Sequence, residues 1–271
     1  MIRLAVRVAR ADAEIALAEL LALAPTGFEE VDRGDTIEYA VYGAPGELPA
    51  LPDLRAAAGA AFVDVTTTEV ADDWAQRWRT FHRPLTVGGR LHVRPPWCDA
   101  PGDPGLLDIV VDPGQAFGTG AHHTTRMCLE ALLELEPGGA FMDLGCGSGV
   151  LAIAAAKLGW APVAGVDHER ESVAATLDNA AVNGVQVRAF AGDLLRDGPV
   201  PSAPTIAANL VRPLLAHVAQ AGFDGEPPRV LIASGLLHAE ADAIAAAFAP
   251  HGLRERARRR SGEWTALTLA R

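Results

Sequence analysis

Short apolar runs and polar turns alternate through the first seventy residues. Apolar and polar side chains alternate cleanly in 36–42, at Ile37, Tyr39 and Val41, which predicts a half-buried strand. Further strands are predicted at 2–8, 28–31 and 61–65, and helices at 12–23 and near 53–58. The order β-α-β-β-α-β is that of a ferredoxin-like module, so we expect a small α+β domain over residues 1–68.

Residues 69–104 have the features of a connection between domains. Trp74 and Trp78, four positions apart, predict a helix over 69–81 whose aromatic stripe packs on a domain face rather than forming a binding box. Two short strands are expected in 85–93, around Gly88-Gly89. Pro95-Pro96 and Pro104-Gly105 then mark a boundary.

From residue 105 onward, apolar runs alternate with helical stretches. Strands are predicted at 107–111, 141–144, 163–166, 185–190, 205–208 and 230–233, with a helix at 124–135. Such runs suit strands buried on both faces of a parallel sheet. The last two strands, 253–258 and 264–269, are joined only by a turn at Ser261-Gly262, which predicts an antiparallel pair. We therefore expect a Rossmann-like α/β domain over 105–271 with one antiparallel strand near the edge.

Composition narrows the setting of the protein. No stretch of the 271 residues approaches the roughly 18 apolar residues of a membrane span, and Arg3, Arg7 and Arg10 argue against a signal peptide. The three cysteines are far apart, which suits reduced thiols. These features predict a cytoplasmic protein without membrane contact.

The net charge is −11 at pH 7, which disfavours non-specific nucleic-acid binding and favours a basic partner. We accordingly expect no direct nucleic-acid readout, and we expect a monomer. The one basic run, residues 254–260, is interpreted as a solvated strand or loop rather than as a binding patch.

A glycine-rich turn, Asp143-Leu-Gly145-Cys-Gly147-Ser-Gly149, follows a predicted buried strand. Glycines let the backbone turn sharply and approach a ligand closely. Asp167 ends the next predicted strand, where it can accept hydrogen bonds from both ribose hydroxyls of a nucleoside. The turn therefore predicts nucleoside binding.

Two details favour S-adenosylmethionine over a nicotinamide dinucleotide. The third glycine comes two residues after the second, and Val150 stands where a dinucleotide fold would have Gly or Ala. Asp143 also precedes the first glycine by two residues, a form in which no pyrophosphate has to be cradled. Asp193 is placed either to meet the adenine amine or to cap a turn.

A second motif, residues 112–125, joins a strand to a helix. Its glycines predict a tight loop, and Thr124 or Thr125 can cap the following helix, whose N-terminus would lie beside the donor's carboxylate. His122 and His123 have no third ligand nearby, so no metal site is expected.

Together these motifs resemble bacterial ribosomal-protein methyltransferases of the PrmA type, which methylate protein eleven of the large ribosomal subunit. The resemblance also covers 178–184, 208–210, 234–236 and Glu263-Trp264. It implies a class I methyltransferase sheet, and an N-terminal domain that recognises a basic ribosomal protein. In that family the donor is held at positions matching Thr125, Gly145, Asp167 and Asn209. The residues expected to bind S-adenosylmethionine are Phe117, Gly118, Thr119, His122, Thr125, Asp143, Gly145, Gly147, Gly149, Asp167, Asp193 and Asn209.

The expected reaction is methyl transfer to lysine or N-terminal amines. Asn209, at the end of the fourth sheet strand, is the candidate catalytic residue, since its amide oxygen could orient the amine. It could instead serve only the donor, or cap a helix starting near Val211. Other functions left open are methylation of another protein or a small-molecule amine, a donor-binding sensor, and a nicotinamide oxidoreductase.

Overall fold

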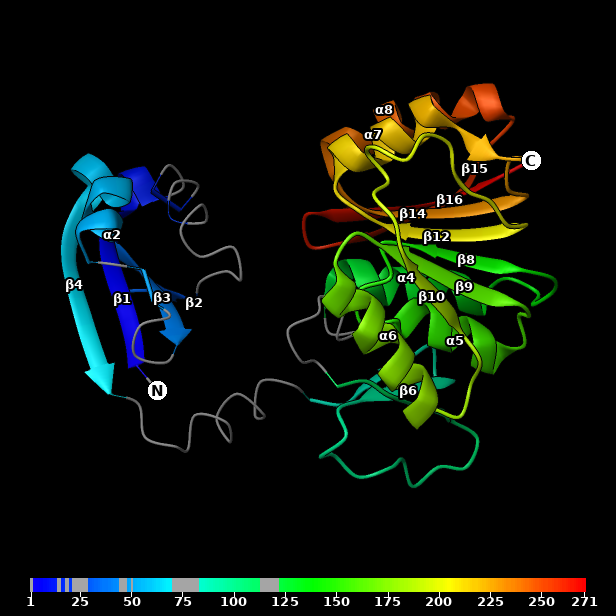
Figure 1. Ribbon diagram of the computed structural model, residues 1–271, viewed down its shortest axis with the longest axis horizontal. Coiled ribbons are helices and arrows are strands. Elements are labelled where there is room, and N and C mark those ends of the chain that lie inside the picture. Colours follow the sequence, from blue (N-terminus) through cyan, green and yellow to red (C-terminus); the bar gives the residue numbers. More distant parts are fainter. Residues whose placement is uncertain are drawn as a thin grey trace. The chain divides into compact units, whose positions relative to one another are not determined.

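The computed structural model describes residues 2–13, 16–17, 20, 29–43, 48–49, 51–69, 83–112 and 122–271. The chain divides into two compact units, Met1–Phe81 and His82–Arg271, and each is described by itself (Figure 1). The predicted helix over 69–81, with Trp74 and Trp78, lies outside the described residues.

The N-terminal unit holds a four-stranded antiparallel sheet. Its strands are β1 (Ile2–Ala9), β2 (Glu29–Asp32), β3 (Thr36–Gly43) and β4 (Phe62–Glu69). They lie in the order β2-β3-β1-β4. Helix α2 (Leu51–Ala58) and the helical residues 13, 16, 17 and 20 supply the other layer, while short 3-10 turns occupy η1 (Arg10–Asp12) and η2 (Gly59–Ala61). The four strands lie where the sequence predicts them, and the ferredoxin-like class stays a prediction.

One face of this sheet is apolar. The side chains of Val6, Tyr39 and Leu54 are buried in a single cluster that also contains Leu20. Successive side chains of a strand point to opposite faces, so the alternation of β3 places Glu38 on the other face. That face carries charged side chains.

The C-terminal unit is built on a seven-stranded sheet with the order β10-β9-β8-β12-β14-β16-β15. The strands are β8 (Phe141–Leu144), β9 (Val163–Asp167), β10 (Arg188–Ala191), β12 (Thr205–Asn209), β14 (Val230–Leu237), β15 (Arg254–Ser261) and β16 (Trp264–Ala270). All neighbours pair in parallel except at β16, which is antiparallel to β14 and β15. This confirms the predicted parallel sheet with one reversed strand near its edge.

Helices cover both faces of the seven-stranded sheet (Figure 1). One face packs against α4 (His123–Leu133), α5 (Val150–Leu158) and α6 (Arg170–Val182). The other packs against α7 (Arg212–Ala221) and α8 (Ala241–Phe248), with 3-10 turns η3 (His238–Glu240) and η4 (Ala249–His251) at either end of α8. Two separate buried clusters, one on each face, form the core of this unit.

The remaining strands form two small sheets. β5 (Leu85–Val87), β6 (Leu91–Arg94) and β7 (Leu107–Val110) make a three-stranded sheet, and β11 (Val200–Pro201) pairs with β13 (Phe223–Asp224). β7 pairs with β6 and not with the large sheet. The two strands expected in 85–93 were predicted to lie in a connection that ends at residue 104. In the structure these strands, β5 and β6, belong to the compact unit His82–Arg271.

Among the described residues, no helix combines the length and the apolar character needed to cross a lipid bilayer.

Candidate active site

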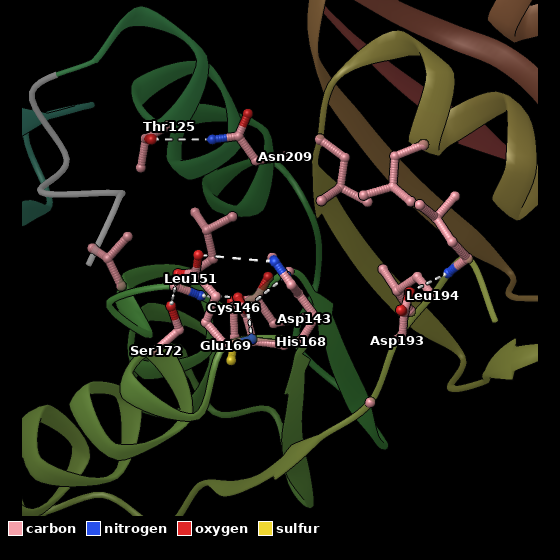
Figure 2. A pocket seen from close by; sticks show the side chains of 18 residues that line it. Thr125, Asp143, Cys146, Leu151, His168, Glu169, Ser172, Asp193, Leu194 and Asn209 are labelled. Carbon is pink, nitrogen blue, oxygen red and sulfur yellow. Dashed lines mark hydrogen bonds and ion pairs between the residues drawn. The ribbon is translucent and has the colours of Figure 1, made fainter. Parts of the chain in front are cut away.

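A cavity of about 420 Å³ opens at the carboxyl ends of β8, β9 and β12 (Figure 2). Parallel strands place their C-terminal ends at one edge of a sheet, which is where α/β folds bind ligands. The described residues that line it are Thr125, Asp143, Gly145, Cys146, Gly147, Val150, Leu151, Asp167, His168, Glu169, Ser172, Gly192, Asp193, Leu194, Leu195, Asn209, Leu210 and Leu214.

The glycine turn forms one wall of this cavity. Gly145, Gly147 and Gly149 have φ values of 73°, 52° and 80°, in the left-handed region that favours glycine. At Gly145 a Cβ atom would also lie 2.5 Å from Leu210 Cδ2. Gly149 is the N-cap residue of α5, so the turn leads directly into the first N–H groups of that helix.

Asp143 lies beneath the turn and is almost completely buried. Its Oδ2 accepts a hydrogen bond from the Ala152 amide at 3.2 Å, while Oδ1 is buried without a partner among the described residues. Burial raises the pKa of the carboxyl group to about 8; the amide of Ala152 opposes this change, and the charge of Asp167 adds to it. A buried carboxyl oxygen without a donor indicates that a bound group completes the site.

Asp167 ends β9 and holds the turn in place. Its Oδ2 accepts from the Gly147 amide at 2.9 Å, and its Oδ1 accepts from the Glu169 amide at 3.0 Å. Each carboxylate oxygen has a second lone pair, so both can still accept from a ligand in the cavity. His168 Nδ1 lies 3.4 Å from Asp167 Oδ1.

The ionisable groups around the cavity are mostly acidic. Four carboxyl groups line it, and His168 is the one basic side chain among the described lining residues, which include no lysine or arginine. Phosphate groups in proteins are usually met by Arg, Lys or helix N-termini. An acidic cavity favours a ligand that carries positive charge over a pyrophosphate.

Asn209 and Thr125 close the cavity opposite the glycine turn (Figure 2). The Asn209 amide group donates to Thr125 Oγ1 at 3.1 Å. Helix α7 has Val211 as its N-cap residue with no side-chain cap, so the alternative that Asn209 caps this helix is wrong. Thr124, which precedes Thr125 in the chain, is held by Ser234, whose hydroxyl donates to the Thr124 carbonyl at 3.2 Å.

His122 caps helix α4, a role that the sequence assigned to Thr124 or Thr125. Its Nδ1 accepts from the Thr124 amide at 3.4 Å and lies 2.8 Å from Thr124 Oγ1. The ring packs edge-on against Trp264, with centroids 5.2 Å apart, and burial together with His123 lowers the pKa of His122. An imidazole nitrogen can accept a hydrogen bond from a backbone N–H as a hydroxyl oxygen does, which is how a histidine serves as the cap here. His122 is not among the lining residues.

Asp193 caps a turn, and its contact with the adenine amine stays a prediction. It lines the cavity, and its Oδ1 accepts from the Leu195 amide at 2.9 Å, so it also stabilises a turn. Phe117, Gly118 and Thr119 lie outside the described residues.

Several lining residues were not predicted. Cys146, Leu151, His168, Glu169, Ser172, Leu194, Leu195, Leu210 and Leu214 directly follow or adjoin the predicted positions in sequence or on the next helical turn. The signal that could have found them is position alone, because residues at the ends of parallel strands converge on the same edge. Within the described part of the chain, no three His, Cys, Asp or Glu residues are arranged to hold a metal ion.

Comparisons with known proteins agree on one family. The family model described as "Ribosomal protein L11 methyltransferase (PrmA)" matches residues 53–271. A ribosomal protein L11 methyltransferase from Bordetella bronchiseptica is 36% identical over 259 residues, covering 82% of this chain and 83% of the relative. One from Geobacter metallireducens is 40% identical over 207 residues, covering 74% and 67%. The crystal structure of a ribosomal protein L11 methylase from Lactobacillus delbrueckii subsp. bulgaricus superposes with a TM-score of 0.62 at 29% identity, covering 70% of this chain and 99% of that one.

Proposed function

Because this chain belongs to the ribosomal protein L11 methyltransferase (PrmA) family, we propose that it transfers methyl groups from S-adenosylmethionine to amines of ribosomal protein L11. The observation that carries the proposal is the acidic cavity beside the glycine turn, with a buried Asp143 oxygen that no described residue contacts by a hydrogen bond. The methyl donor carries a sulfonium and an ammonium group, which suits such a cavity. The seven-stranded sheet is that of a class I methyltransferase.

The described residues fit the parts of the donor. Asp167 has lone pairs left for the ribose hydroxyls, and the open Oδ1 of Asp143 suits a cationic donor group. Asp193 would meet the adenine amine. When bound, the donor supplies an activated methyl group on a positively charged sulfur. Among the residues expected to contact it, Phe117, Gly118, Thr119 and His122 rest on the family resemblance alone.

The acceptor is a lysine or N-terminal amine whose lone pair must be free for an in-line attack. A lysine pKa near 10.4 means that deprotonation at pH 7 costs roughly 4–5 kcal/mol. Desolvation in the cavity lowers this cost, because burial disfavours the ammonium form. The Asn209 amide donates to Thr125, which leaves its carbonyl oxygen to accept from the amine and orient it. The proton then leaves to solvent, and catalysis rests on alignment.

A second substrate class stays open because the family model begins at residue 53, within the N-terminal unit. The strands β1, β2 and β3 therefore lie outside the matched range. We assign substrate recognition to the N-terminal unit. An enzyme with the same catalytic unit could then act on another protein or on a small-molecule amine.

Donor binding is tested by titration calorimetry with S-adenosylmethionine. A side chain at Gly147 would strain a backbone with φ of 52° that donates to Asp167, so Gly147→Val should weaken binding about 100-fold or more. Gly138→Val is the matched control, since a Cβ there meets no atom and its φ is not positive. Wild-type affinity in Gly147→Val would contradict the assignment of this cavity to the donor.

Substrate identity is tested with ribosomes from cells that lack the gene. Incubation with the enzyme and isotopically labelled donor should label L11, and mass spectrometry of its peptides identifies the amines. Label appearing only in other molecules would support the second substrate class.

The role of Asn209 is tested with the Asn209→Ala variant. Its turnover rate at saturating donor should be lower than that of the wild type by a factor of about ten or more. Wild-type turnover would show that Asn209 does not position the amine.

A further inference from the structure

Helix α6 carries a buried polar stripe, of which only Ser172 lines the donor cavity. Ser172, Thr176 and Asn179 recur at the spacing of one helical face, and Asn183 continues the stripe at the C-cap. Thr176 is fully buried and Asn179 is 4% exposed. Buried polar side chains are retained where they satisfy specific hydrogen bonds, so each member should hold a defined partner.

Two members of the stripe hold the glycine turn. The Thr176 hydroxyl donates to the Gly147 carbonyl at 2.9 Å, and the Asn179 side-chain NH₂ donates to the Ser148 carbonyl at 2.9 Å. These are consecutive carbonyl groups of the turn that lines the cavity. Helix α6 therefore fixes the backbone orientation of the turn from behind.

The same stripe holds the strand that precedes the second motif. Asn179 Oδ1 accepts from the Asp112 amide at 3.0 Å, just beyond the end of β7. Asn183 brackets Val110, accepting from its amide at 2.9 Å and donating to its carbonyl at 2.6 Å. Within the described residues, Asn179 is the one side chain of the stripe that bonds to both the glycine turn and the end of β7.

These contacts join two segments that share no sheet. β7 belongs to the three-stranded sheet, whereas the glycine turn follows β8 of the seven-stranded sheet. The two polar ends of one planar amide group cannot move independently, so a shift at Ser148 is transmitted to Asp112. Hydrogen-bond networks are one of the connections through which energetic coupling is carried, and Asn179 supplies such a connection here.

We infer that Asn179 is a positioning residue that couples occupancy of the donor cavity to the order of the chain at Asp112. This inference rests on the proposed function, because the ligand expected in the cavity beside the glycine turn is the methyl donor. A donor against the turn would restrict its motion further; the Ser148 carbonyl of the turn accepts from the Asn179 amide, and the Asn179 carbonyl oxygen accepts from the Asp112 N–H. Asn179 itself does not line the cavity.

The test is hydrogen–deuterium exchange resolved to single amides in the full chain, with and without S-adenosylmethionine. In the wild type, saturating donor should slow exchange at Asp112 about tenfold. In Asn179→Ala this donor-dependent slowing should disappear, and donor affinity measured by calorimetry should fall about tenfold, since the Ser148 carbonyl loses the hydrogen bond from Asn179.

Asn183→Ala is the matched control because it removes hydrogen bonds to β7 without touching the glycine turn. It should keep both donor affinity and the donor-dependent slowing at Asp112. Asn179→Asp retains an acceptor for the Asp112 amide and loses the donor to Ser148. It should therefore protect Asp112 without donor and show no further slowing on donor addition, which keeps the test available if Asn179→Ala does not fold.

Different failures are distinguishable. If the wild type binds the donor but exchange at Asp112 does not respond, the coupling is wrong and the proposed function stands. If Asn183→Ala loses the donor response as fully as Asn179→Ala, the stripe has only a general structural role and the inference is overturned. If the wild type shows no heat of donor binding, the proposed function fails and the inference falls with it.

Discussion

Each unit of this protein buries a carboxyl group, and the two groups differ in the hydrogen-bond partners that surround them. Glu38 in the N-terminal unit is buried on the charged face of its sheet, where Arg3, Arg7 and Arg33 donate to its two oxygens. Asp143 in the C-terminal unit is buried near the end of β8; among the described residues it has one backbone donor, and its other oxygen has no partner.

The pKa values follow this difference. Burial raises the pKa of Glu38, but hydrogen bonds from Arg3, Arg33 and Arg7 outweigh it and lower the pKa to about 2. For Asp143 no cation offsets burial, and the pKa rises to about 8. The carboxylate of Glu38 has its partners within its own unit, whereas the open oxygen of Asp143 is consistent with the proposed binding of a cationic donor group.

The largest effect is expected from removing the paired carboxylate. Glu38→Ala leaves three arginines around an unfilled buried position, so unfolding of the N-terminal unit should become easier by about 3–5 kcal/mol. Hydrogen exchange of the β1 and β3 amides in the full chain measures this. Asp64→Ala, an exposed carboxylate on β4, is the control. Equal effects of the two variants would show that the arginine cluster is not stabilising.

The unpaired carboxylate should matter for ligand binding instead. Asp143→Asn keeps the side-chain volume but removes a carboxyl group that can ionise against a cationic group of the donor, so donor affinity should fall about 10–100-fold, or about 1.4–2.8 kcal/mol. Titration calorimetry measures the change, and Asp178→Asn, an exposed residue of α6, is the control. An affinity equal to that of the control would mean that Asp143 does not face a positive group of the donor.

The two carboxylates should also give opposite pH dependences. Folded Asp143 keeps a proton that the unfolded chain releases, so its contribution to stability falls as pH rises from about 3.8 to 8. Folded Glu38 stays ionised below the unfolded pKa of 4.5, so its contribution is present above that pH and lost as pH falls toward 2. Each slope is at most about 1.4 kcal/mol per pH unit.

Urea unfolding of the wild type and of Asp143→Asn across pH 4 to 8 isolates the first contribution, and hydrogen exchange of Glu38→Gln across pH 2.5 to 5 isolates the second. If the contributions of Asp143 and Glu38 to stability changed with pH in the same direction, the opposite pKa shifts of the two carboxyl groups would be contradicted.

The smallest effect is expected at the edge of the arginine cluster. Arg33 is about half exposed and lies 3.3 Å from Glu38, so Arg33→Ala should reduce stability by less than about 1 kcal/mol. Arg3 is more deeply buried and closer, at 2.7 Å, so Arg3→Ala should cost more. The same exchange measurement on β3 ranks the two variants, and the reverse order would contradict the burial argument.

Most of the fold follows from local patterns. The strands of the large sheet lie within a few residues of the predicted runs, because a strand buried on both faces must be apolar throughout. The position of β7 was not predictable in this way. Its run is as apolar as the others, and only pairing with β6 decides which sheet it joins.

Some residues of the candidate site were likewise predictable from the sequence, and others were not. Gly145, Gly147 and Gly149 are identified by spacing, and their positive φ values explain why no other residue type serves as well. His122 caps α4, a role that the sequence analysis gave to Thr124 or Thr125, since histidine at a cap carries no strong sequence signal. Thr176 and Asn179 gave no signal either, because polar residues on a helix are ordinarily expected to face solvent.

The sequence by itself determined the alternation of strands and helices, the glycine turn and the acidic residues at strand ends, since these depend on backbone conformation and on neighbours along the chain. Only the tertiary structure decided which buried polar groups are satisfied. Asn179 reaches Ser148 and Asp112, which lie 31 and 67 positions away, while the Asp143 oxygen reaches no donor among the described residues. Hydrogen bonding acts over about 3 Å in space, and no pattern along a chain encodes which distant segments come within that range.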